Sequence, residues 1–238
     1  MSAVEQNEAN VRGRRAKSLA AWGLLAGGVS FFVGGSLHPG EDPPGLTLKE
    51  HLLLLYEDSS WYPSHALLLV GMVLIAASLV ALVRAKTLAS APRAHTASVI
   101  AAFAAVLGAA ASLLHLVAAT EADKIAAGER TPLTDVSLVI ETVINPAVGL
   151  SIAALALIGA LTRTIGYRLT AVFGVVGGVA YALAGGTVLL TDKLNFLFPF
   201  SAGIAVWAVA AAIRLLLNAR ANTTAGSRVA YTTRGTVG

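Results

Sequence analysis

Residues 61–83 read WYPSHALLLVGMVLIAASLVALV and contain no Asp, Glu, Lys or Arg. A helix rises 1.5 Å per residue, so a segment of this length covers the hydrocarbon core of a bilayer, which is about 30 Å thick. Lipid offers no water to hydrogen-bond a backbone, and an apolar segment therefore crosses it as an α-helix. We interpret residues 61–83 as a transmembrane helix, with Trp61 and Tyr62 in the aromatic belt at the membrane interface.

Five further apolar runs have similar lengths. Hydrophobic residues make up 56% of the chain and charged residues 13%, about half the charged share of a soluble domain. The predicted spans are residues 18–37, 61–83, 97–119, 132–161, 169–190 and 196–217. The predicted fold class is therefore all-α, a polytopic membrane protein built as a bundle of six transmembrane helices.

The charges predict the orientation of the bundle. Lys and Arg are concentrated in the tail 1–17, the loops 84–96 and 162–168, and the C-terminal segment, whereas the other loops carry most of the acids. The positive-inside rule then places both termini in the cytoplasm of a multi-pass protein of the cell membrane. This distribution explains the basic pI, so we infer no nucleic-acid partner. Residues 218–238 are polar, and we expect a disordered cytoplasmic tail.

Helix-start signals divide the loops. Thr47 and Glu50 have the spacing of a capping box, which predicts a short helix over 48–57 within the extracytoplasmic loop 38–60. Ser60 and Thr131 precede the second and fourth spans and are expected to be N-caps.

Small residues recur every fourth position in the fifth span. Because the hydrophobic effect does not drive helices together in lipid, such residues allow the close contacts that do. The pattern predicts helix packing within the bundle, and the same surface is a candidate for homo-oligomerisation or for contact with other membrane subunits. The ridge consists of Gly174, Gly178, Ala182 and Gly186.

Glu141 is the most conspicuous polar residue in the spans. An ionised side chain in the hydrocarbon costs about 2.5 kcal/mol or more, so its presence requires an explanation. Asn145 lies one turn deeper on the same helix face, and Pro146 frees a backbone carbonyl beside it. Four of the five histidines lie on the same predicted side of the membrane as Glu141, namely His38, His51, His65 and His115.

Imidazole nitrogens and a carboxylate are good ligands for zinc, copper or iron. We therefore predict a transition-metal site in the extracytoplasmic half of the bundle, formed by His38, His51, His65, His115 and Glu141. Alternatively, His65 and His115 would hold a b-type haem. Either cofactor would serve electron transfer or metal-dependent chemistry, and no catalytic residue is assigned.

Two other functions fit the same residues. The chain could be a non-catalytic subunit of a larger membrane complex, in which the polar layer only holds helices together. It could instead be a small channel or carrier in which Glu141 and Asn145 line a path for protons or solutes.

The composition adds two constraints. The absence of cysteine excludes thiolate metal sites and covalent haem attachment. The richness in Ala, Gly, Val and Arg suggests a bacterial source.

Overall fold

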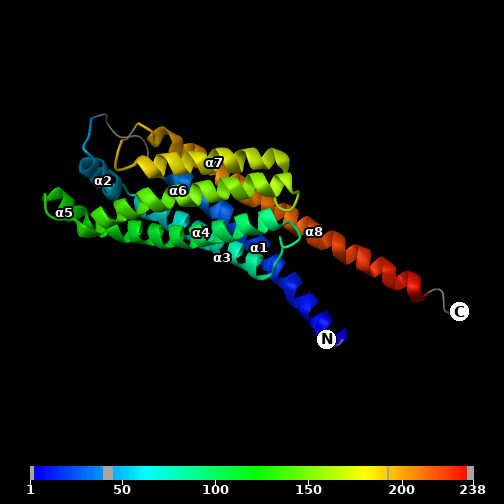
Figure 1. Ribbon diagram of the computed structural model, residues 1–238. Helices are drawn as coiled ribbons and strands as arrows, with labels where there is room; N and C mark the ends of the chain where they lie inside the picture. Colours follow the sequence, from blue (N-terminus) through cyan, green and yellow to red (C-terminus); the bar gives the residue numbers. More distant parts are fainter. Residues whose placement is uncertain (1–2, 40–44, 192, 235–238) are drawn as a thin grey trace.

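The computed structural model describes residues 3–39, 45–191 and 193–234, and every regular element in these ranges is helical (Figure 1). Within these ranges six helices are long and apolar enough to cross a membrane, which confirms the all-α fold with six candidate spans. They belong to α1 (Ala3–Leu37), α3 (Trp61–Arg84), α4 (Pro92–Ala118), α6 (Pro132–Leu161), α7 (Arg168–Thr187) and α8 (Ala202–Arg234).

The two ends of the bundle differ in what they carry. The start of α1 and the end of α8 lie at one end, which we call the terminal end, while α2 (Leu48–Glu57) and α5 (Ala122–Ala126) lie at the other, which we call the α2 end (Figure 1). The short helices η1 (Ala119–Glu121) and η2 (Asn195–Ser201) lead into α5 and α8. Cytoplasmic termini remain a prediction from the charges.

Two helices extend past the predicted spans. α1 begins at Ala3, and α8 continues to Arg234, where the sequence predicted a disordered tail over 218–238. Neither extension contains a proline, so helical backbone hydrogen bonds continue without interruption.

The N-caps follow the predictions only in part. α2 has the expected capping box, because Oε2 of Glu50 accepts the N–H of Thr47 at 2.8 Å and Oγ1 of Thr47 accepts the N–H of Glu50 at 3.3 Å. Ser60 and Thr131 form no side-chain cap, so those two predictions are wrong. The hydroxyl of Ser60 donates to Asp58 instead, and that of Thr131 accepts a bond from Lys49.

Backbones approach each other most closely where glycines face each other. A Cβ built on Gly149 would lie 2.2 Å from the carbonyl oxygen of Gly178, and one on Gly71 would lie 2.7 Å from the backbone nitrogen of Phe31. These contacts hold α6 against α7 and α1 against α3.

The predicted small-residue ridge packs within the chain. A Cβ on Gly174 would meet Ala156, and one on Gly186 would meet Pro146, both on α6. Oligomerisation through this ridge remains a prediction, although the ridge is already used in the contact between α6 and α7.

We predict that Gly178→Leu destabilises the protein. The new side chain would collide with the backbone of Gly149 and force α6 and α7 apart, at a cost of about 1–3 kcal/mol or more. Gly35→Leu is the matched control, because nothing lies within 4 Å of a Cβ at that helical position. Unfolding in mixed micelles by titration with a denaturing detergent measures both variants, and equal stability would contradict the packing described here.

Candidate functional site

Three histidines from three different segments meet at the α2 end. His38 directly follows α1, His65 lies in the second turn of α3, and His115 lies in the last turn of α4. The ring centroids of His38 and His65 are 4.9 Å apart, and those of His65 and His115 are 5.1 Å apart. We call these three residues the histidine cluster.

Trp61 lies at the centre of the histidine cluster. Its ring stacks on His65 with a centroid distance of 3.5 Å and lies 5.0 Å from His115 and 6.1 Å from His38. The side chain is fully buried, and its Nε1 atom has no hydrogen-bond partner within the described residues. Trp61 is therefore covered by protein and Tyr62 is 48% exposed, while the interfacial depth of both remains a prediction. Trp61 is buried because α2 covers the start of α3, and Tyr56 of α2 contacts its ring.

Glu141 joins the cluster from α6. Its Oε1 atom lies 2.8 Å from Nδ1 of His115, although the approach lacks the alignment of a hydrogen bond. The hydroxyl of Ser137, one turn earlier on α6, donates a hydrogen bond to the same carboxylate oxygen. The side chains of His115 and Glu141 are only 17% and 13% exposed, so solvent would screen little of the attraction between Glu141 and a protonated His115.

The Nδ1 atoms of His38 and His65 face backbone carbonyls, which only accept hydrogen bonds, and Nδ1 of His115 faces the Glu141 carboxylate without hydrogen-bond alignment. The Ser64 hydroxyl, which itself donates to the Trp61 carbonyl, also lies 3.2 Å from Nδ1 of His65. His38 Nδ1 lies 3.0 Å from the carbonyl of Pro39, His65 Nδ1 lies 2.9 Å from the carbonyl of Trp61, and His115 Nδ1 faces Glu141. A neutral imidazole carries one proton, and these partners favour that proton on Nδ1. Each Nε2 atom then keeps its lone pair, through which an imidazole can bind a metal ion.

No ligand set is preassembled in the described part of the chain, where no three His, Cys, Asp or Glu side chains are placed to hold a metal ion. The rings pack against Trp61 and against one another. Bringing three Nε2 atoms to one point therefore requires side-chain rotation.

The other predicted site residues lie beside the cluster. His51 is half-buried on α2 and close enough to His38 for their charges to interact. Asn145 lies one turn below Glu141 and accepts a hydrogen bond of 2.9 Å from the Tyr181 hydroxyl of α7. Asn145 thus joins α6 to α7, a contact that the sequence analysis did not predict.

The pKa of His38 is lowered from its ordinary value of 6.5. The main cause is the protein packed around its ring, which displaces water that would solvate the charged form, even though part of the side chain remains exposed. The charges of His115 and His51 lower the pKa further, whereas the carbonyl of Pro39 raises it.

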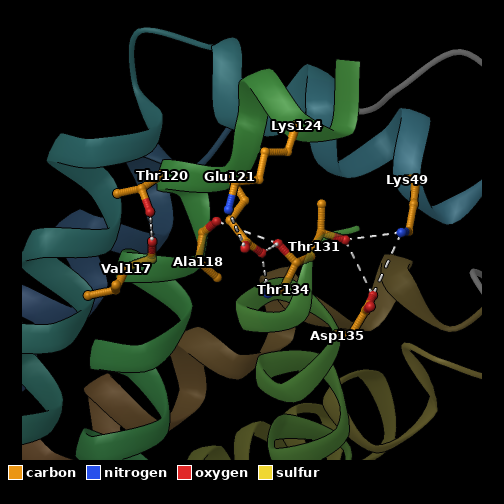
Figure 2. Close-up of polar contacts among 9 residues, drawn as sticks. All are labelled: Lys49, Val117, Ala118, Thr120, Glu121, Lys124, Thr131, Thr134 and Asp135. Carbon is orange, nitrogen blue, oxygen red and sulfur yellow. Dashed lines mark hydrogen bonds and ion pairs between the residues drawn. The ribbon is translucent and has the colours of Figure 1, made fainter. Parts of the chain in front are cut away.

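Glu121 secures the loop that covers this end (Figure 2). Its Oε2 atom accepts hydrogen bonds from the backbone N–H and the hydroxyl of Thr134, at 3.0 and 3.2 Å, and so caps the start of α6. Lys124 lies 3.3 Å from Oε1, and the Glu121 side chain is only 2% exposed. The sequence analysis missed this cap, because its only signal is an acidic residue three positions before a lysine.

Lys49 ties α2 to the start of α6. Its Nζ atom donates a hydrogen bond of 3.0 Å to Thr131 and lies 3.8 Å from Asp135, as Figure 2 shows. This contact between partly exposed side chains links α2 to α6, and Leu52, Leu55 and Tyr56 of α2 are buried with Trp61 in an apolar cluster.

The spanning helices and this site define the class of the molecule, a multi-pass α-helical membrane protein with a polar cluster at one end of its bundle. No protein-family model, curated protein or solved structure matches the chain.

We predict that Glu121→Ala lowers the free energy of unfolding by about 1–3 kcal/mol, because it leaves the buried N–H of Thr134 without an acceptor. Glu129→Ala, on an exposed residue of the same loop, should have little effect. Thermal unfolding in detergent compares the two variants, and a similar loss in both would rule out the capping role.

We predict that acid destabilises the α2 end through His38. The pKa of His38 is lower in the folded protein than in the unfolded chain. Below about pH 6.5 the unfolded chain therefore binds more protons than the folded protein, and the free energy of unfolding decreases as the pH falls. His38→Gln should therefore narrow the difference in melting temperature between pH 8 and pH 5. If His38→Gln and wild type show the same pH dependence, the assignment to His38 is wrong.

Proposed function

We propose that the chain is an integral membrane protein that binds one transition metal ion through Nε2 of His38, His65 and His115. The observation that carries the proposal is the shared orientation of the three rings, each with Nδ1 toward an oxygen acceptor. Metal-ligating histidines characteristically donate their second ring N–H to a carboxylate or a backbone carbonyl, which fixes the ring and raises its basicity. Imidazole ligands suit zinc, copper, iron and nickel.

Glu141 acts in this proposal as a positioning residue. Its carboxylate faces Nδ1 of His115 and is itself held by Ser137. A negative charge at this position compensates part of the charge of the bound ion in a poorly solvated site. His51 on α2 supplies a cover or a further ligand. The expected role is electron transfer or metal-dependent chemistry near the membrane surface.

Formation of the metal site would require small rotations of the rings. Zn–N bonds are about 2.0–2.1 Å long, so three rings around one ion also lie close to one another. The rings of the histidine cluster are already neighbours, at 4.9 and 5.1 Å between centroids. Trp61 would shift to admit the ion.

A b-type haem has less support than a single ion. A haem bound between His65 and His115 would need a flat gap between their rings, yet Trp61 packs against both.

A conducting channel also has less support. The buried polar residues described toward the terminal end are Ser78, Ser98 and Ser151, and each hydroxyl donates to a carbonyl of its own helix. A proton path would need polar groups that continue from Glu141 across this half.

The test is metal binding by the full chain in detergent, loaded separately with Zn²⁺, Cu²⁺ and Co²⁺ and then dialysed. We expect about one ion per chain by elemental analysis, with a Co²⁺ absorption spectrum characteristic of nitrogen ligands. His65→Ala and His115→Ala should abolish binding, and Glu141→Gln should weaken it about 10- to 100-fold. His95→Ala is the matched histidine control and should bind like wild type.

Three outcomes would overturn the metal site. A folded wild-type protein that retains no ion would favour the subunit interpretation, in which the cluster only staples helices. Equal binding by wild type and His65→Ala would place the ion elsewhere. A Soret band in the purified protein that His65→Ala abolishes would replace the single ion with haem.

A further inference from the structure

A second polar site lies at the terminal end, independent of the histidine cluster. A hollow of about 400 Å³ opens where α6 ends, α7 begins and α8 passes them. Three of its lining residues are arginines from these three segments, Arg163, Arg168 and Arg214, and none is acidic. No acidic side chain of the described residues forms an ion pair with them.

Arg214 is held in place before any ligand binds. Its Nη2 atom donates a hydrogen bond of 2.6 Å to the carbonyl of Arg163, and its Nη1 atom donates to the carbonyl of Gly166. The guanidinium also lies over the ring of Tyr167, at 5.2 Å from the centroid. A guanidinium has five N–H donors, so three remain for a ligand.

Arg163 and Arg168 complete the cationic lining. Arg163 adopts the left-handed conformation, with φ of 56°, and both side chains are exposed. Arg168 is the first residue of α7, where the positive end of the helix dipole also favours an anion. Planar guanidinium groups match the oxygens of a phosphate in bidentate pairs.

Exposed apolar side chains close in sequence to residues that line the hollow indicate which kind of molecule carries the phosphate. Leu161, Leu169 and Leu217 are 67%, 75% and 50% exposed and directly adjoin the arginine-bearing segments in sequence. On a membrane-spanning helix such residues face acyl chains. A headgroup bound by the arginines would therefore place its own acyl chains along these leucines.

We infer that the hollow binds the phosphate headgroup of an anionic phospholipid from the leaflet at the terminal end. Basic pockets between transmembrane helices are a recurrent form of such sites. The arginines contact the phosphate, and the exposed leucines distinguish a lipid from a soluble phosphate.

The test uses native mass spectrometry of the full chain in detergent with dioleoylphosphatidylglycerol, compared with zwitterionic dioleoylphosphatidylcholine. Wild type should prefer the anionic lipid about tenfold, and Arg163→Gln/Arg168→Gln should lose most of this preference. Neither side chain forms a hydrogen bond or an ion pair within the described part of the protein, so the double variant should fold, as circular dichroism would show. Arg214 is left unchanged because it supports the loop.

The matched control is Arg84→Gln/Arg93→Gln, which removes the same charge from the adjoining ends of α3 and α4. If both double variants lose the preference equally, the attraction is a general surface effect and the site is wrong. Displacement of the lipid by millimolar inorganic phosphate would equally overturn the lipid assignment. Retention of the lipid under that competition, with loss only in Arg163→Gln/Arg168→Gln, would support it.

Discussion

Close contact between helix backbones is the constraint on which the rest of this structure depends. Neighbouring helices in lipid gain little from burying apolar side chains, so their contacts rely on shape and on short distances. Gly27 faces Gly71 between α1 and α3, and Gly149 faces Gly178 between α6 and α7. The side chain of Val148 on α6 packs against Gly108 of α4. These contacts set how closely neighbouring helices pack, which keeps α1, α3, α4 and α6 near one another along the bundle.

The polar chemistry of the molecule is unevenly distributed along the bundle. At the α2 end, buried polar groups such as His65, Glu121 and Thr134 interact across elements, and Lys49 and Glu121 fasten the surrounding segments. Toward the terminal end the buried core consists largely of alanine, leucine and isoleucine, and the charges lie at its rim. The bundle therefore has an apolar core and a different group of polar residues at each end.

Much of the fold could be predicted from the sequence, because the length of an apolar run and the need to satisfy backbone hydrogen bonds leave a single solution for each span. The nearness of His115 to Glu141 was also predictable, since their depths follow from their positions in two such runs. The burial of Trp61 was not, because it depends on α2 folding over α3. The helix caps were not predictable either. Ser60 and Thr131 are residue types that often cap helices, but their hydroxyls bind Asp58 and Lys49 instead. The cap that does form at the start of α6 comes from Glu121, which lies across a loop from it.

Trp61 is also an optical reporter inside the histidine cluster. Stacked at 3.5 Å on His65, its indole senses any protonation or ligation of that imidazole. Trp207, the other fully buried indole, lies beside Gly166 beneath the arginine-lined hollow, whereas Trp22 is 56% exposed. Replacing the other two tryptophans would leave a natural fluorophore at one chosen end of the bundle, so events at the two ends could be followed separately without an attached label.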